Sequence, residues 1–138
     1  MKDAEKTVGL MADKAKICYL SYIDGQGFPV TRAMLRPRER EGITTFYLST
    51  NTSSNKVASL IANPNAGLYF VDTRFYRGVC LNGTAEILTD EESKKRIWRT
   101  GDTMYYKKGV TDPDYCVIKF TATRGRYYSG FKNEDFEI

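Results

Sequence analysis

The sequence predicts a mainly β protein, an antiparallel barrel with helices packed on its outside. Short segments rich in aromatic and β-branched residues alternate with turn signals at hairpin spacing, which is typical of about six or seven strands. Ten tyrosines and seven phenylalanines support this prediction, because both residue types favour strands. About three helical patterns do not alternate regularly with the strands, so a parallel Rossmann-like sheet is not expected. The 138 residues contain no repeat or linker and predict a single domain, 1–138.

The chain opens with an amphipathic helix over residues 3–15 and a β-hairpin. The apolar segment 17–23 is the first strand, and the turn Asp24–Gly27 contains the Asp-Gly pair that tight hairpins favour. The second strand covers residues 28–35. A charged loop over residues 36–42 follows it.

A strand, a polar loop and a helix come next. The strand begins at Ile43 and leads into Ser49–Asn55, where every side chain is a hydroxyl or an amide. Apolar residues return at helical spacing after Lys56. Asn63–Pro64 ends this helix.

The second half of the chain completes the barrel. Strands are expected at 67–72 and 76–88, and Gly83 inside the longer one indicates a bulge or a close backbone approach. An N-cap with acidic residues opens a helix at Thr89 that runs through about Arg99, and a further helical turn is expected near 101–108. The last two strands are expected at 115–121 and 124–130.

Composition narrows the possible functions. The net charge of +4 is mild and spread along the chain, which permits a phosphate-bearing ligand without requiring nucleic acid. Histidine is absent, which excludes Ser–His–Asp and Cys–His catalysis and the commonest metal ligand; no metal site is predicted. Three cysteines in apolar segments without metal spacing indicate buried, reduced thiols of a cytoplasmic protein. No signal peptide or membrane-length apolar run is expected.

The polar loop before Lys56 is the candidate anion site. A helix N-terminus offers free N–H groups and a partial positive charge, and the hydroxyls and the ammonium add donors and charge. Alternatively, Ser53 or Ser54 serves only as an N-cap and Lys56 is a solvated surface lysine. Arg32, in the middle of a strand, either converges with Lys56 on one phosphate or faces solvent.

Other polar and aromatic residues carry weaker signals. The scattered carboxylates are expected to be surface or capping groups: Asp72, Glu86, Asp102, Asp112 and Asp114. Trp98 is expected in the core. The aromatic residues Tyr127, Tyr128 and Phe131 could stack on a flat ring, although strand packing is the simpler use. Nucleic-acid binding by Arg124 and Arg126 is only weakly indicated.

The order of these segments resembles the FMN-binding split-barrel family of pyridoxamine 5′-phosphate oxidase-like proteins, within it the short general stress protein 26 type. The resemblance covers roughly residues 5–130. It rests on DGQGFPVTRAM, FYLST, SSNK, NPNAGLYFVD, VCLNGTAEI, DEESKKRIW and KKGVTDPDYCVIKF. It implies a Greek-key split β-barrel and a homodimer with FMN at the interface.

The resemblance also implies a set of cofactor-binding residues. By position, Arg32 would contact the FMN phosphate, and the backbone of the next three residues would follow the flavin: Ala33, Met34 and Leu35. Two residues at the end of the next strand would touch the flavin and ribityl chain: Ser49 and Thr50. The phosphate-binding loop would comprise Ser54, Asn55 and Lys56.

Departures from the family pattern shape the expected function. Asn55 stands where full oxidases often carry an arginine, and Gly78 aligns with a flavin-contacting glutamine. The Arg-x-His segment that binds the pyridoxine substrate is absent. The resemblance therefore implies an FMN-binding flavoprotein, a flavin-dependent oxidoreductase with a small-molecule redox partner that does not act on pyridoxamine phosphate itself. A non-catalytic flavin-binding or stress-response module, or a split barrel using F420 or haem, remains an alternative.

Overall fold

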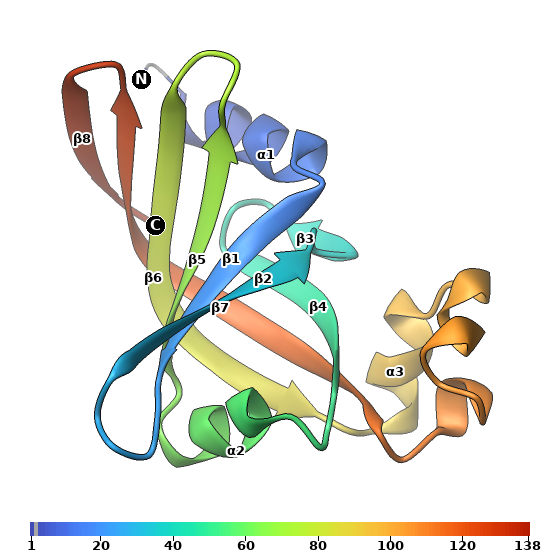
Figure 1. Ribbon diagram of the computed structural model, residues 1–138. Coiled ribbons are helices and arrows are strands. Elements are labelled where there is room, and N and C mark those ends of the chain that lie inside the picture. Colours follow the sequence, from blue (N-terminus) through green and yellow to red (C-terminus); the bar gives the residue numbers. More distant parts are fainter. Residues whose placement is uncertain (2) are drawn as a thin grey trace.

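The computed structural model describes Met1 and residues 3–138. Its described part contains one eight-stranded antiparallel sheet in the order β2-β1-β5-β6-β7-β4-β3, with β8 also paired to β7 (Figure 1). The strands are β1 Ile17–Ile23, β2 Pro29–Leu35, β3 Glu39–Glu41, β4 Thr45–Asn51, β5 Asn65–Asp72, β6 Arg77–Leu88, β7 Tyr115–Ser129 and β8 Lys132–Glu137. The sheet curls into an open barrel, so the prediction of a mainly β split barrel is confirmed.

Helices lie at the two ends and at one side of the barrel. Figure 1 shows α1 (Ala4–Lys14) and α2 (Asn55–Ala62) at opposite ends of the sheet. Helix α3 (Glu91–Ile97) and the 3-10 turns η1 (Thr100–Met104) and η2 (Gly109–Thr111) stand at the side. None of the helices in the described residues is long and apolar enough to span a membrane.

Two short edge strands were not predicted. β3 lies in the segment expected to be a charged loop, and its residues are Glu-Arg-Glu. β8, with the sequence KNEDFE, pairs with the far half of β7. Neither strand shows apolar alternation, because each is held at an edge by backbone pairing rather than by a buried face.

The last two predicted strands form one continuous strand, β7. Its first half pairs with β4 and its second half with β8, while β6 pairs along almost its full length. The register of β6 against β7 shifts between Asn82 and Gly83, which confirms the predicted bulge. A Cβ at Gly83 would collide with the Thr121 carbonyl oxygen, so the close approach requires glycine.

The strand predicted to begin at Ile43 begins at Thr45 and continues through Asn51. The polar loop therefore comprises only residues 52–54, and α2 starts at Asn55. Pairing with β7 overrides the low strand propensity of Asn51, which lies opposite Tyr115. The short loop fixes the distance between the end of β4 and the start of α2.

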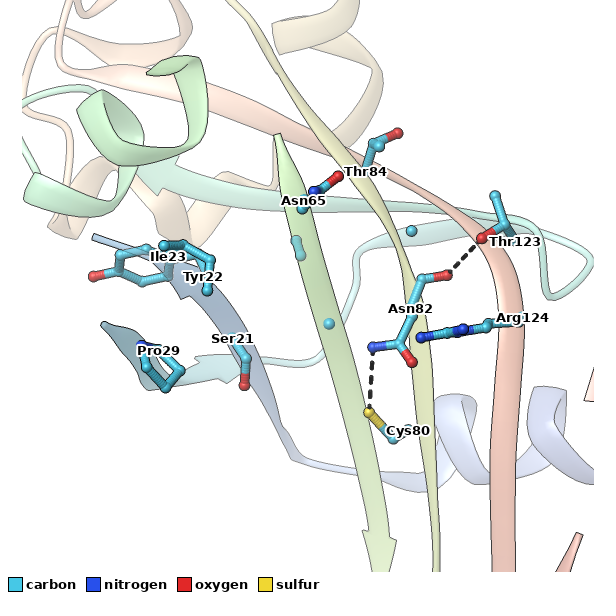
Figure 2. A pocket seen from close by; sticks show the side chains of 13 residues that line it. Ser21, Tyr22, Ile23, Pro29, Asn65, Cys80, Asn82, Thr84, Thr123 and Arg124 are labelled. Atoms are coloured by element: carbon cyan, nitrogen blue, oxygen red, sulfur yellow. Dashed lines mark hydrogen bonds between the residues drawn. The ribbon is translucent and has the colours of Figure 1, made fainter. Parts of the chain in front are cut away.

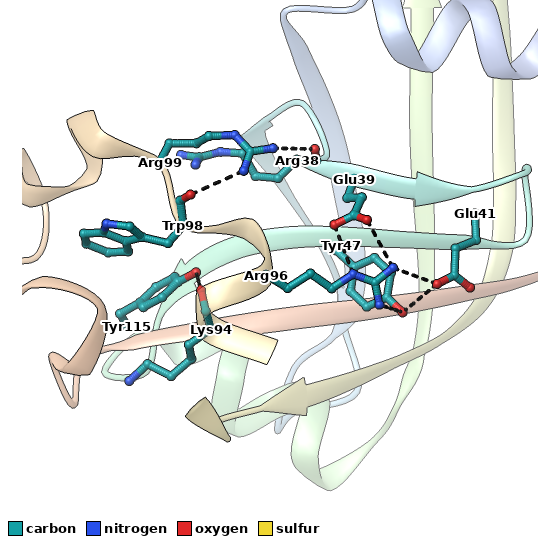
Figure 3. A network of polar contacts seen from close by, with 9 residues as sticks. All are labelled: Arg38, Glu39, Glu41, Tyr47, Lys94, Arg96, Trp98, Arg99 and Tyr115. Carbon is teal, nitrogen blue, oxygen red and sulfur yellow. Dashed lines mark hydrogen bonds and ion pairs between the residues drawn. The ribbon is translucent and has the colours of Figure 1, made fainter. Parts of the chain in front are cut away.

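Two apolar clusters stabilise this arrangement. The larger one fills the barrel and takes in Val8 of α1, Phe46 of β4 and Leu60 of α2. The smaller one lies under α3 and contains Tyr47, Ile97, Tyr106, Tyr115 and Val117, with Trp98 packed against it. Figure 3 shows Trp98 beside Tyr115, with ring centroids 5.1 Å apart. Trp98 is half-buried and packs against the core cluster rather than inside it, so its predicted core position is confirmed only in part.

Candidate functional site

A cleft opens where the barrel is split. β2 and β3 are the two ends of the strand order, and in the part of the chain described they do not pair with each other. A cleft of about 410 Å³ lies between the edge of β2 and the end of β4. It is lined by Arg32, Ala33, Met34, Leu35, Arg38, Ser49, Thr50, Asn51, Lys56, Asp102, Tyr105, Tyr106 and Asp114.

Most of the predicted site residues meet in this cleft. Residues 32–35, Ser49, Thr50 and Lys56 all line it. Ser54 lies one contact away, since the Lys56 ammonium donates a hydrogen bond to its Oγ at 3.2 Å. Asn55 is exposed and does not line the cleft. The structure thus brings the edge of β2 next to the connected segments β4 and α2.

The edge of β2 presents backbone hydrogen-bonding groups to the cleft. The Arg36 N–H donates to the Lys16 carbonyl at 3.2 Å, and hydrogen-bonded and non-hydrogen-bonded pairs alternate along an antiparallel ladder. The backbone of Met34 therefore faces β1, whereas the N–H and C=O groups of Ala33 and Leu35 do not join the ladder with β1. The Leu35 carbonyl accepts a hydrogen bond from the Cys18 thiol at 3.7 Å. The edge offers the backbone groups of Ala33 and Leu35 to a flat ligand without distortion of the sheet.

Lys56 is the unusual residue of the cleft. Its side chain is buried, with 5% of the residue exposed, and lies in the first turn of α2. Burial lowers the pKa of its ammonium, and the nearby charge of Arg32 lowers it further. Among the described residues no carboxylate lies within 4.0 Å of Lys56. The interpretation of Lys56 as a solvated surface lysine is therefore wrong.

The side chain of Ser54 does not act as an ordinary N-cap. It occupies the N-cap position of α2, but its side chain makes no capping hydrogen bond to the helix backbone. Its hydroxyl accepts from Lys56 instead. Two neighbouring cations, one of them desolvated, at a helix N-terminus form an arrangement that an anion would stabilise.

The far side of the cleft is held by an ion pair that the sequence did not reveal. Arg38 donates to the two carboxylate oxygens of Asp102 at 2.9 and 2.7 Å, and the Arg99 N–H donates to the same carboxylate at 2.9 Å. Burial opposes the charge on Asp102, yet these hydrogen bonds and the arginine charges hold its pKa below the ordinary value. Asp102 is 3% exposed, and its carboxylate caps the 3-10 turn η1 by accepting from the Arg99 N–H. Of the two roles predicted for it, surface or capping group, the structure shows the capping one.

Two tyrosines complete the wall opposite β2. Tyr106 is buried in the smaller apolar cluster, and burial raises the pKa of its phenol to about 12. Tyr105 beside it is largely exposed. The cleft therefore has a cationic end at Arg32 and Lys56 and an aromatic wall carrying a neutral phenol. No spacing in the sequence linked this wall to β2.

A second hollow, of about 540 Å³, lies on the outer face of β1, β5 and β6. Figure 2 shows its labelled side chains, with the Asn82 amide 3.9 Å from the Cys80 sulfur and Arg124 beside them. Burial raises the pKa of the Cys80 thiol. Arg124 is exposed, so this hollow lacks the desolvated cation that marks the cleft at β2.

Comparisons with known proteins place the chain in a family. The family model described as pyridoxamine 5′-phosphate oxidase matches residues 5–129. No curated protein matches the chain. A solved structure from Clostridium acetobutylicum, described as related to general stress protein 26 of B. subtilis (pyridoxinephosphate oxidase family), is 38% identical, with a TM-score of 0.89, over 98% of this chain and 94% of that one.

Two more distant structures share the fold alone. An FMN-binding, pyridoxamine 5′-phosphate oxidase-related protein from Nostoc punctiforme is 12% identical, with a TM-score of 0.72, over 98% of this chain and 89% of that one. A heme-binding protein from Mycobacterium smegmatis is 17% identical, with a TM-score of 0.77, over 98% of this chain and 58% of that one.

The family model spans most of the chain, and the Clostridium relative resembles it in sequence as well as in fold. This chain therefore belongs to the pyridoxamine 5′-phosphate oxidase family.

Proposed function

We propose that the chain binds FMN in the cleft beside β2 and functions as a flavin-dependent oxidoreductase. The observation that carries the proposal is the buried Lys56, which lies near Arg32 at a helix N-terminus and has no carboxylate partner among the described residues. A phosphate would satisfy both cations with charge-assisted hydrogen bonds. The FMN-binding relative from Nostoc punctiforme supports the same choice of ligand.

The rest of the cleft fits a flavin. The backbone groups of Ala33 and Leu35 could hydrogen-bond to the polar edge of a flat ring, and the partly apolar wall at Tyr106 could cover its face. When bound, the flavin would supply electron transfer. The chain's residues would hold the phosphate, orient the ring and exclude water. We assign no catalytic acid or base.

A homodimer with FMN at the interface belongs to the proposal. Large apolar side chains are exposed on β1 and β2 beside the cleft, including Ile17 (48%), Tyr19 (37%) and Leu35 (57%). A second copy would cover them. Light scattering of the purified protein should give about twice the chain mass of 15.7 kDa, and a mass equal to one chain would reject the dimer.

The first experiment is to release any ligand from the purified protein by heat and to record its absorption spectrum. FMN, F420 and haem differ in their spectra, so one measurement separates them. The haem alternative is kept because of the Mycobacterium smegmatis neighbour, although this chain has no histidine to ligate iron. A colourless protein that fails to bind added FMN at micromolar concentration would reject the proposal.

Turnover separates an oxidoreductase from a flavin-binding or stress-response module. FMN-loaded protein is mixed with NADH or NADPH, and their oxidation is followed with a panel of acceptors. Sustained oxidation supports the enzyme, whereas bound FMN without turnover supports the module. Pyridoxamine phosphate is expected to be a poor substrate, because the sequence contains no histidine for the substrate contact that the family resemblance implies.

A further inference from the structure

Two hairpin turns at the same end of the sheet, between β5 and β6 and between β7 and β8, carry large exposed aromatic side chains (Figure 1). Phe75 and Tyr76 lie on the first turn and Phe131 on the second, and their exposed fractions are 60%, 72% and 105%. We propose that these two turns, here called the aromatic tips, bind the surface of a bilayer that contains anionic phospholipids. The inference is independent of the proposed flavin function.

The aromatic tips are held beside each other. The Gly130 N–H of one turn donates to the Tyr76 carbonyl of the other at 3.2 Å. The Tyr76 ring also packs edge-on against Tyr128 of β7, with ring centroids 6.2 Å apart. Tyr76 has a φ of 49°, in the left-handed region where glycine is unstrained and an aromatic residue is uncommon. The two turns therefore present their aromatic rings as one surface.

The acidic groups near the aromatic tips are already paired with cations. Asp72 at the end of β5 accepts from Arg77 at 3.0 Å, and Glu134 of β8 accepts from the N-terminal ammonium at 2.7 Å. Asp135 lies 3.5 Å from Arg126. Each of these carboxylates has a cation of its own, so none of them leaves a net negative charge beside the tips.

Two further cations give the aromatic tips a net positive charge. The guanidinium carbon of Arg74 lies 5.2 Å from the centroid of the Phe75 ring, and Lys132 directly follows Phe131. Both cations are exposed. Across the described chain, no carboxylate lies within 4.0 Å of Arg74 or Lys132. Their charges are available to an anionic partner at the same place as the exposed rings.

This combination suits a lipid surface better than a nucleic acid or a small ligand. Aromatic rings favour the headgroup level of a bilayer, and basic side chains are attracted to anionic headgroups. Single-stranded nucleic acids stack along grooves, and small molecules occupy concave sites. The full exposure of Phe131 leaves its ring without a groove around it.

The test sediments the purified protein with vesicles of phosphatidylglycerol and phosphatidylcholine in equal amounts, and with vesicles of phosphatidylcholine alone. Binding should be at least about tenfold tighter to the anionic vesicles and should weaken as salt rises. Arg74→Gln and Lys132→Gln should each weaken it about fivefold. The double variant Phe75→Ser/Phe131→Ser should weaken it at least about tenfold.

Phe28 provides the matched control. It is a phenylalanine of similar exposure, 63%, and lies next to the β1–β2 turn. Figure 1 shows this turn at the opposite end of the molecule from the aromatic tips. Phe28→Ser should therefore leave vesicle binding within twofold of the wild type, and an equal loss in Phe28→Ser and the double variant would overturn the proposal.

A fluorescent variant tests insertion directly. Phe131→Trp should shift its emission to the blue with anionic vesicles, whereas Phe28→Trp should not; the single native tryptophan, Trp98, gives a background that is measured in the wild type. Absence of vesicle binding or of the blue shift would overturn the proposal. So would a change from dimer to monomer in Phe75→Ser/Phe131→Ser, measured by light scattering, because the tips would then be an interface between copies of the chain.

Discussion

Replacing Lys56 with methionine separates a ligand-binding role from a structural one. Methionine keeps most of the buried stem and removes the charge. If the ammonium bonds to the FMN phosphate, its loss should cost about 1.5–3 kcal/mol of binding free energy, a rise in the FMN dissociation constant of about 10- to 150-fold. Flavin fluorescence titration measures the change.

The flavin-free protein should respond in the opposite direction. Lys56 is desolvated, lies close to Arg32, and has a lowered pKa. Its charged form therefore opposes folding, and Lys56→Met should raise the free energy of unfolding by about 1 kcal/mol. Urea denaturation without FMN measures this gain.

The pH dependence has a defined sign. A lysine whose folded-state pKa is lowered destabilises the fold while it is charged, and this penalty disappears as pH rises from the lowered pKa to the ordinary value of 10.5. The difference in free energy of unfolding between Lys56→Met and the wild type, both flavin-free, should thus become smaller as pH rises through this window. FMN affinity should fall more steeply in wild type, because only there does a phosphate ligand lose its cation.

Lys94 provides the matched control. It is also buried, but its ammonium donates to the Asp112 carbonyl at 2.9 Å and does not line the cleft. Lys94→Met should lower stability by about 1.5–3 kcal/mol and leave FMN affinity within twofold. If Lys56→Met behaves like Lys94→Met, losing stability without losing FMN affinity, the ligand-binding interpretation of Lys56 is refuted.

Three further outcomes follow from the described contacts. Arg32→Ala should weaken FMN by about 1.5–3 kcal/mol with little change in flavin-free stability, as measured by the same titrations; unchanged affinity would move the phosphate elsewhere. Asp102→Asn should cost about 3 kcal/mol of unfolding free energy because it leaves the Arg38 charge without its partner. Since the pKa of Asp102 is lowered, this contribution is present above the ordinary aspartate pKa of about 3.9 and is lost as pH falls through the folded value, so variant and wild type should converge in acid. Gly83→Ala should cost about 2 kcal/mol or more because its methyl group would strike a β7 carbonyl, whereas Gly101→Ala, with no atom within 4 Å, should be neutral; equal thermal stabilities of the two variants would contradict this.

Local patterns predicted most of the fold. The Asp-Gly turn marked the first hairpin, and the internal glycine marked the bulge. The helix predicted from Thr89 through about Arg99 is present as Glu91–Ile97, and its N-cap is Asp90, whose carboxylate accepts a hydrogen bond from the Ser93 N–H at 3.0 Å. The elements that were missed, β3 and β8, are short polar edge strands that pair in hairpins with their sequence neighbours β4 and β7. No periodicity within such a segment distinguishes it from a loop.

Local patterns also predicted part of the candidate site. Arg32 and Lys56 stood out as cations beside strand and helix signals, and family resemblance related them to one ligand. The burial of Lys56 could not be read from the loop, because it depends on how β2, β4 and α2 meet. Arg38 and Asp102 pair across the chain through tertiary packing alone, so no local pattern pointed to them.

The most direct test of the central claim compares the affinity of the wild-type protein for FMN and for riboflavin, which lacks the phosphate. If Arg32 and Lys56 hold the phosphate, FMN should bind at least about 100-fold more tightly, since two charge-assisted contacts are lost with riboflavin. Equal affinities for the two flavins would contradict the account, because the buried cation at the start of α2 would then have no part in binding.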